Sequence, residues 1–419
     1  MNVLNLRTRI PEEVRDRLPR EASRMRHLFG RLEGVFHSWG YREVITPGFE
    51  FLDTVTAGAG AQGKREDLYQ FFDRQGRTLA LRADMTTPIA RLAATKMSGE
   101  PLPLRLSYFT PVFRHRGRKA GSVNEIWQAG IELIGAPGAA ADAETIAVAC
   151  DALAATGLLG VKIGLGHVGF VEGILAETGV APALQDELKE ALASRDLVAF
   201  EKGVTQAGLP ESQVGLLLSL ATFQGSHPQA LERFKGVANR RVVEALEQIG
   251  TVLTLLESLG LSERVSLDLG LVRSLGYYTG VVFEGYAPGV GSPILGGGRY
   301  DNLLADFGGD LPATGFAFEV DRLLAGLERQ NRLGDDPGLD AIVECPPGRE
   351  AQALDTARQL RAQGLMVEVD LLGRAGDELR KYAQTRDAAL LVSPDGANAH
   401  RTGENGVRHL YTTSPASIH

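Results

Sequence analysis

The stretch Leu-Val-Arg-Ser-Leu-Gly-Tyr-Tyr-Thr-Gly-Val-Val-Phe-Glu, residues 271–284, combines an arginine, two adjacent tyrosines and a strand-forming run. Its second half, Val281-Val282-Phe283, consists of residue types that favour a β-strand. Successive side chains on a strand point to opposite faces, so we expect that Tyr277 and Tyr278 do not both face the core. One of them, with Arg273, is then expected to face a pocket. From these residues alone, an ordinary strand with one interface tyrosine is the alternative.

Composition narrows the class of protein. The chain has 419 residues, long enough for two or three domains, and its 44% hydrophobic and 23% charged residues are ordinary for a globular protein. The net charge of −8 argues against an extended nucleic-acid surface. Cys150 and Cys345 lie far apart without metal-ligand spacing, which fits a reducing cytoplasm and predicts no metal site. No apolar run reaches the roughly 18 residues of a membrane span, and the N-terminus lacks a secretion signal. We therefore expect a cytoplasmic protein without membrane association.

Periodicity outlines the first part of the chain. Apolar residues at three- and four-residue spacing predict a helix over 20–39, and a short strand closed by a proline follows over 41–47. Two strands over 68–82 are joined by a glycine-containing turn. Strands over 104–116 and 124–134 are separated by a glycine-rich loop, which is typical of an antiparallel hairpin.

The remainder alternates between helices and strands. Helices are expected over 140–156 and 168–178, with a strand at 161–166 between them. Residues from about 182 to 260 contain several apolar helical segments and predict a helical insertion. A strand at 265–269 precedes the quoted stretch. For the end of the chain we expect a linker at 331–338 and a small α/β domain over 339–419, with strands at 341–344, 366–370, 388–392 and 407–411 and helices at 351–363 and 377–384.

Polar residues on the second hairpin form a candidate site. Gln128, Gly130 and Glu132 differ by even steps, so they share one face of their strand, and Arg114 lies on the other arm. Burying these groups without partners would cost several kcal/mol. They either pair with one another as a structural network or hold a small polar ligand.

Three further features leave alternatives open. Asp84 and Thr86 precede a helix that has Pro88 in its first turn, so both could be helix caps. Gly296-Gly297-Gly298, placed before an expected helical segment, requires a bent or closely approached backbone and lacks the Gly-Lys-Ser/Thr of a phosphate loop. Arg322 is expected on a helix, where a single arginine is usually solvated.

Together these motifs resemble the catalytic core of class II aminoacyl-tRNA synthetases over roughly residues 10–330. The short strand ending in Pro47, the Phe113-Arg114 pair and the Gly315 strand followed by Arg322 resemble the three motifs of that class. The quoted stretch, with the glycine run and Arg299-Tyr300-Asp301, is similar to histidyl-tRNA synthetase and its relatives. The resemblance implies an α+β fold: an antiparallel sheet flanked by helices over 1–330, with the helical insertion and the small C-terminal α/β domain.

Four features, two resemblances and two departures, favour the non-catalytic paralogue of the synthetase, the regulatory subunit of ATP phosphoribosyltransferase. The sequences at 81–86 and at 128–135, the latter followed by Ala-Asp-Ala-Glu, resemble the paralogue. Arg116 replaces the glutamate expected to bind adenine, and Gly276 replaces the aspartate before the two tyrosines. Ser122 and Asn124 replace loop arginines. Amino-acid activation needs an acceptor for adenine and cations at the α-phosphate, so we expect no efficient adenylation.

The resemblance implies a retained histidine pocket and no catalytic residues. Its members are Asp84, Thr86, Arg114, Gln128, Glu132, Arg273, Tyr277 and Tyr278. Asp84, Thr86 and Gln128 would meet the ammonium group of histidine, and Arg114 would pair with its carboxylate. Glu132 would accept from the imidazole between the two tyrosines. Arg273 matches a catalytic arginine of the synthetase and would keep a ligand or structural contact, and Arg322 would be a vestigial nucleotide contact.

The function implied by the resemblance is feedback control of histidine biosynthesis. The chain would bind histidine as effector, without a cofactor, and assemble with a short-form ATP phosphoribosyltransferase catalytic subunit, which requires it for activity. The family arrangement is a homodimer within a hetero-octamer of four regulatory and four catalytic chains, with no tRNA bound. The alternatives are a histidyl-tRNA synthetase, which histidine-dependent exchange between ATP and pyrophosphate would reveal, and an unrelated small-molecule binding module.

Overall fold

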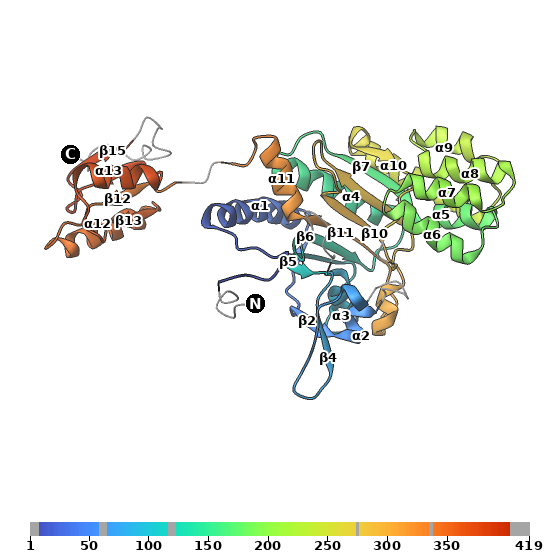
Figure 1. Cartoon of the computed structure of the whole chain (residues 1–419), viewed down its shortest axis with the longest axis horizontal. Coiled ribbons are helices and arrows are strands. Elements are labelled where there is room, and N and C mark those ends of the chain that lie inside the picture. Colours follow the sequence, from blue (N-terminus) through green and yellow to red (C-terminus); the bar gives the residue numbers. More distant parts are fainter. Residues whose placement is uncertain (1–7, 58–64, 116–122, 274–275, 335–337, 403–419) are drawn as a thin grey trace. The chain divides into compact units, whose positions relative to one another are not determined.

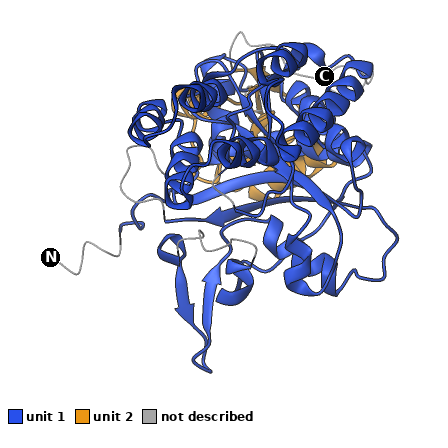
Figure 2. Cartoon of the chain, turned by 90° about the vertical axis from the view of Figure 1, so that its right-hand side faces the viewer, with its two compact units in different colours: residues 1–333 blue, residues 334–419 orange. Residues whose placement is uncertain are grey.

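The computed structural model describes residues 8–57, 65–115, 123–273, 276–334 and 338–402. Contacts along the chain divide it into two compact units, residues 1–333 and 334–419 (Figure 2). The first unit contains the large sheet and all the candidate site residues.

An eight-stranded sheet organises the first unit (Figure 1). Its six central strands pair antiparallel, whereas the edge strands β1 and β8 pair parallel with their neighbours. This confirms the expected antiparallel sheet. In spatial order the strands are β1 (Arg42–Glu43), β5 (Leu104–Phe113), β6 (Glu125–Ile134), β11 (Ala313–Glu319), β10 (Leu295–Arg299), β9 (Val281–Tyr286), β7 (Lys162–His167) and β8 (Val265–Leu267).

Strand β6 shows how the two faces of the sheet differ. Its Ala129, Ile131 and Leu133 point into a large core built mainly from helices. The intervening positions, which include Ile126 and Ile134, face a smaller core on the opposite side. The large core contains residues of α1 (Pro19–Ser38), α4 (Ala139–Thr156), α5 (Val168–Glu177), α10 (Arg240–Ser258) and α11 (Val320–Arg329), and the smaller core contains residues of α3 (Thr86–Thr95) and η5 (Leu303–Phe307). Gln128 and Glu132 therefore belong to the face covered by α3.

The segment between β7 and β8 is helical throughout most of its length, as the sequence indicated. Four helices, together with α5 and α10, form a cluster beside the edge of the sheet (Figure 1). These are α6 (Pro182–Ala193), α7 (Leu197–Gln206), α8 (Glu211–Thr222) and α9 (His227–Phe234). We call α6 to α9 the insertion. Its buried leucines and phenylalanines join the large core, so it packs onto the fold without a separate core.

A small three-stranded sheet projects from the first unit (Figures 1 and 2). It consists of β2 (Phe49–Phe51), β3 (Gln70–Phe72) and β4 (Thr78–Leu81), with β4 in the middle. The hairpin of β3 and β4 was expected, whereas β2 and the short helix α2 (Leu52–Thr56) were not. They escaped prediction because each spans only one turn or a few residues.

The second unit is a four-stranded sheet with two helices. Strands β12 (Ala341–Val343), β13 (Val367–Val369) and β14 (Leu390–Val392) pair parallel, and β15 (Ala399–Arg401) adds antiparallel to β14. The helices are α12 (Glu350–Ala362) and α13 (Gly376–Thr385). The strand expected at 407–411 lies outside the described residues, and β15 was not anticipated. Among the helices of the described ranges, none is long and apolar enough to cross a membrane.

Candidate functional site

A cavity of about 90 Å³ opens on the face of the sheet that α3 covers. Residues from six segments meet around it, and seven of the eight positions assigned to the pocket from sequence line it, as does Arg322. These seven are Asp84, Thr86, Arg114, Gln128, Arg273, Tyr277 and Tyr278. Segments nearly 200 residues apart in the chain therefore contribute to one polar site, with Glu132 behind its wall.

Glu132 is the most deeply buried acid of the site, with an exposed fraction of 1%. The hydroxyl of Thr86 donates to its Oε1 at 2.7 Å, and the hydroxyl of Tyr300 donates to its Oε2. Burial raises the pKa of the Glu132 carboxyl to about 8, although the hydrogen bonds from Tyr300 and Thr86 oppose this shift. Gly315 lies directly opposite on β11, and any side chain there would overlap the carboxylate.

Asp84 combines a capping contact with its place at the cavity. Its Oδ1 accepts from the backbone N–H of Thr87 at 2.7 Å, in the first turn of α3. Its Oδ2 accepts from the Thr87 hydroxyl at 3.3 Å. The helix-cap interpretation of Asp84 therefore holds, and the cap also fixes a carboxylate at the rim of the cavity. Thr86, in contrast, uses its hydroxyl to hold Glu132.

A strip of glycines forms the floor beside the cavity. Gly296 and Gly298 on β10 and Gly164 and Gly166 on β7 flank β9 on both sides, opposite Glu284 and Val282, and so share one face of the sheet. A Cβ at Gly296 would overlap the Arg273 guanidinium, and one at Gly298 would come within 2.9 Å of the Tyr278 ring. We call these four residues the glycine strip.

The strip explains the run of three glycines in the sequence. The close approach expected there is confirmed, but Gly296-Gly297-Gly298 lies within strand β10 and only a short 3-10 helix, η5, follows it. A Cβ at Gly166 would meet the backbone oxygen of Asp268 at 2.6 Å. The described parts of segment 268–278 thus lie against the bare face of the sheet, which places Arg273 and the tyrosines at the cavity.

The expectation from strand alternation that one of the two tyrosines faces a pocket was wrong, because both do. Tyr277 and Tyr278 both line the cavity, with ring centroids 4.8 Å apart. They precede β9, which begins at Val281, so the alternation of a strand does not apply to them. The ring of Tyr300 lies 5.7 Å from that of Tyr277, and the three rings form an aromatic wall.

Arg273 is held over this floor by an ion pair. Its Nη1 donates to Glu284 Oε1 at 3.1 Å, and its guanidinium carbon lies 5.5 Å from the centre of the Tyr278 ring. Within the described ranges its buried Nε has no hydrogen-bond partner. A buried donor without a partner is costly, so the site is suited to an anionic ligand group at this position.

The two other arginines of the cavity are tied to the fold. Arg114 Nε donates to the carbonyl oxygen of Ala83 at 2.6 Å, next to Asp84. Arg322 forms an ion pair with Glu319 at 2.9 Å and donates from Nη1 to the carbonyl oxygen of Pro293 at 2.6 Å. The charge of Arg322 is therefore compensated by Glu319, and its side chain is 27% exposed. Its position on a helix alone had suggested a fully solvated arginine.

Comparison with known proteins places this chain in a family. A family model described as histidyl-tRNA synthetase matches residues 13–323. An ATP phosphoribosyltransferase regulatory subunit of Symbiobacterium thermophilum is 62% identical over 394 residues, covering 94% of this chain and 98% of the relative. The chain belongs to the ATP phosphoribosyltransferase regulatory subunit family. A second member, from Moorella thermoacetica, is 44% identical, covering 92% of this chain and 98% of the relative.

Solved structures support the family fold. An ATP phosphoribosyltransferase regulatory subunit/histidyl-tRNA synthetase from Bacillus halodurans has a TM-score of 0.82 and 32% identity, covering 92% of this chain and 98% of that one. A histidyl-tRNA synthetase from Nostoc has a TM-score of 0.78 at 22% identity, covering 92% of this chain and 91% of that one, and shows the shared fold alone. The regulatory subunit family therefore uses a class II synthetase-like core.

Several residues at the site were not assigned from the sequence. Glu284, Tyr300, Tyr108 and Glu319 all line the cavity. Glu284 and Tyr300 stand inside the stretches that carried the family resemblance. Glu284 was missed because the strand register that sets it beside the glycine strip depends on tertiary pairing. The expected losses at Arg116 and Ser122 lie outside the described residues. Asn124 is described, and its backbone N–H donates to the carbonyl oxygen of Glu13 at 2.8 Å.

The raised pKa of Glu132 predicts a pH dependence of stability. Between the ordinary pKa of 4.5 and the folded value of about 8, the folded chain holds a proton that the unfolded chain has released. This contribution is therefore fully present below pH 4.5 and is lost as pH rises through about 8. We expect Glu132→Gln to reduce the fall in unfolding free energy over this range by on the order of 3 kcal/mol, measured by urea unfolding. Glu43→Gln, at an exposed position on β1, is the control, and an unchanged slope in Glu132→Gln would contradict the assignment.

The glycine strip predicts a rescue between two substitutions. Gly296→Ala should destabilise the chain by about 1–3 kcal/mol, because its Cβ overlaps the Arg273 guanidinium. In the Arg273→Ala background the same change should cost much less, since the overlapping group is gone. Chemical unfolding of the four forms in a double-mutant cycle measures this coupling. Gly34→Ala, where a Cβ meets nothing within 4 Å, is the matched control, and additive effects would refute the close approach.

Proposed function

We propose that this chain is a non-catalytic regulatory subunit of ATP phosphoribosyltransferase that binds histidine for feedback control of histidine biosynthesis. The partner would be the short-form catalytic subunit, which condenses ATP with phosphoribosyl pyrophosphate and requires the regulatory chain for activity. The observation that carries this proposal is the polar cavity beside Arg273 and the tyrosines, in a chain of this family. It joins acidic, basic and aromatic groups suited to a small amino acid.

Histidine has three recognition groups, and the cavity offers a partner for each. Asp84 and Gln128 would hold the ammonium group, and Arg114 and Arg273 would hold the carboxylate. The aromatic wall would pack against the imidazole. Because Thr86 and Tyr300 occupy both oxygens of the Glu132 carboxyl, we propose that Glu132 acts on the imidazole through these hydroxyls.

Absence of aminoacylation is part of the proposal. The pairing of Arg322 with Glu319 and Pro293 leaves its charge compensated, which disfavours a nucleotide phosphate or adenine contact. A second cavity of about 1030 Å³ shares the lining residues Tyr277 and Tyr278 with the first. Among the described lining residues it has five carboxylates and two arginines, a formal balance of −3, which disfavours an RNA backbone.

Feedback control requires that histidine bind one quaternary state more tightly than another. In the proposed assembly, four regulatory and four catalytic chains form a hetero-octamer, with the regulatory chains paired as homodimers. Histidine would then favour the less active arrangement. The synthetase remains the competing function, since the family model that matches the chain is described by that activity.

Calorimetry with histidine tests the pocket directly. Wild type should bind, and Arg273→Ala should weaken binding by about ten- to a hundredfold, because a charge-assisted hydrogen bond contributes about 1.5–3 kcal/mol. Arg42→Ala, at an exposed edge of the sheet, is the control. Exchange of pyrophosphate into ATP in the presence of histidine should be absent. Absence of histidine binding, or strong exchange, would overturn the proposed function.

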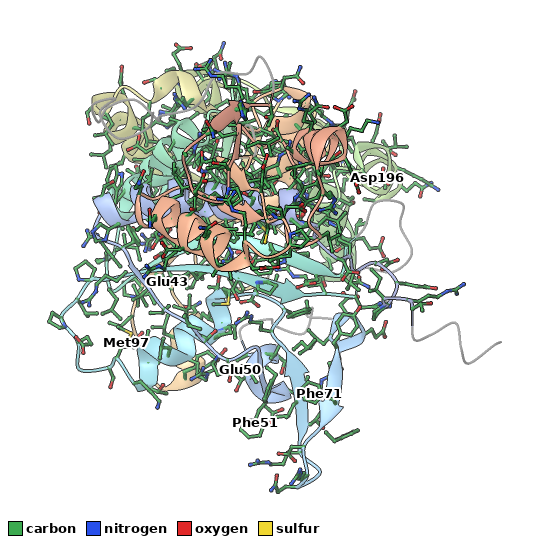
Figure 3. The ribbon with its side chains drawn as sticks, turned by 90° about the vertical axis from the view of Figure 1, so that its left-hand side faces the viewer. Glu43, Glu50, Phe51, Phe71, Met97 and Asp196 are labelled. Carbon is green, nitrogen blue, oxygen red and sulfur yellow. The ribbon has the colours of Figure 1, made fainter. Side chains whose placement is uncertain are left out.

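The projecting sheet offers a surface for the proposed homodimer. Phe49 and Phe51 on β2 and Phe71 on β3 share one face, since Phe51 and Phe71 both lie opposite Leu79. Their exposed fractions are 51%, 44% and 38%, and the rings of Phe49 and Phe71 are 5.7 Å apart. Figure 3 shows Phe51 and Phe71 on this projection. Exposed aromatic clusters of this kind mark interaction surfaces.

We expect the double substitution Phe49→Glu with Phe71→Glu to shift the chain from dimer to monomer, because two carboxylates would be buried in the interface. Light scattering coupled to size-exclusion chromatography measures the mass. Phe72→Glu is the matched control, since Phe72 is 73% exposed but lies on the opposite face of β3. A dimer that survives the double substitution would place the interface elsewhere.

A further inference from the structure

Arg273 is connected to the insertion by a chain of hydrogen bonds. Its partner Glu284 accepts at Oε2 from the hydroxyl of Tyr286 at 2.6 Å. The Nη2 of Arg195 donates to the oxygen of that same hydroxyl at 3.2 Å. Arg195 also forms an ion pair with Asp268, with Nη2–Oδ2 at 2.6 Å and Nη1–Oδ1 at 3.3 Å. We call Arg273, Glu284, Tyr286, Asp268 and Arg195 the relay.

The two ends of the relay lie in different parts of the fold. Arg195 stands in the turn between α6 and α7 of the insertion, whereas Arg273 lines the candidate histidine pocket. Asp268 follows β8 and begins the segment that crosses the glycine strip toward Arg273. Movement of the α6–α7 turn would therefore reach the pocket arginine through both the relay and the backbone of this segment.

The insertion holds the start of this segment at a second point. Gly270 lies so close to the end of α8 that a Cβ there would come within 3.0 Å of the carbonyl oxygen of Leu220 and 3.3 Å of the Cα of Ala221. Gly225, between α8 and α9, forms an isolated bridge with Leu267. These backbone contacts are independent of the Arg195 side chain. Two separate parts of the insertion, the α6–α7 turn and the end of α8, thus contact the segment that carries Arg273.

The backbone of Arg195 has a φ of 59°, in the left-handed region that is uncommon for a residue other than glycine, asparagine or aspartate. Arg195 follows the last turn of α6, where this conformation is a common way to end a helix: its N–H donates to the carbonyl oxygen of Leu192 at 3.1 Å, and the N–H of Asp196 donates to that of Ala191 at 2.9 Å. The end of α6 therefore fixes the backbone from which the Arg195 side chain makes its three hydrogen bonds in the relay.

We infer that Arg195 and Tyr286 are positioning residues that couple the insertion to the pocket by fixing the guanidinium of Arg273. The assignment of histidine as the ligand rests on the proposed function. When the ligand carboxylate engages Arg273, the ion pair with Glu284 adjusts, and Tyr286 and Arg195 transmit the change to the α6–α7 turn. The conformation of the insertion therefore depends on whether the pocket is occupied. A partner chain that contacts the insertion would respond to this change.

A ligand-free experiment tests the relay on its own. Arg273→Ala, a change in the pocket, should accelerate amide hydrogen exchange in residues 194–199 of the insertion, measured by mass spectrometry. Arg114→Ala also removes a cavity arginine but leaves the relay intact, so exchange in this turn should stay at the wild-type rate. Equal exchange in wild type and Arg273→Ala would overturn the coupling, whether or not histidine binds.

Histidine affinity tests the relay from the other end. Tyr286→Phe, Arg195→Ala and Arg195→Gly should each weaken binding about tenfold, although none of these residues lines the cavity. Glycine accepts the left-handed backbone, so Arg195→Gly separates lost coupling from backbone strain. Arg195→Lys should restore part of the affinity, because lysine keeps the charge but cannot bond Asp268 and Tyr286 in the same fork geometry.

Arg240→Ala is the matched control for this series, since it removes an exposed arginine that pairs with Glu244 on α10 and does not touch the relay. Its affinity should equal that of wild type. Wild-type affinity in all the Arg195 and Tyr286 variants would refute the positioning role. Failure of wild type itself to bind histidine would refute the proposed function, and the ligand-free exchange comparison would then decide the relay.

Discussion

The site depends on one steric constraint, the four glycines of the glycine strip on a single face of β7 and β10. Gly296 leaves room for the Arg273 guanidinium, and Gly166 leaves room for the backbone of Asp268. Without these gaps the segment that carries Arg273, Tyr277 and Tyr278 would be lifted from the sheet. Glycine in a strand normally weakens the sheet through lost packing and entropy. Here the segment itself supplies the packing that the missing side chains would have provided.

The buried carboxyl of Glu132 depends on the same principle in the neighbouring strands. Gly315 makes space for it, and Thr86 and Tyr300 satisfy its oxygens. A buried acid is tolerable because both oxygens are hydrogen-bonded and because its raised pKa favours the neutral form. Its two hydroxyl donors are then fixed at the cavity wall. The network thus holds Thr86 and Tyr300 in place at the cavity, and Tyr300 is also part of the aromatic wall.

Sequence reasoning located most of this site but not its geometry. Period-two alternation placed Gln128 and Glu132 on one face, and the motif resemblance collected distant segments into one pocket. Two features of the site could not be predicted from the sequence because they depend on tertiary packing. The register that sets Gly296 and Gly164 on either side of Glu284 cannot be read from one strand, and neither can the turn that lets both tyrosines face the cavity. Short elements such as β2 and β15 lack enough residues for periodicity to identify them.

The contrast between the arginines of the cavity explains how a synthetase-like core would serve as a sensor. Arg322 has its charge compensated by Glu319, so it has little to offer a nucleotide. Arg273 shares Glu284 with Tyr286 and has a buried Nε without a partner in the described ranges, so an anionic ligand group would complete its bonding. A ligand that accepts a hydrogen bond from Arg273 changes the energy of each residue that is hydrogen-bonded to Arg273 directly or through the relay. Since Arg273 is tied to Arg195 in the insertion, binding energy at the pocket would be available to a surface far from it without any chemical step.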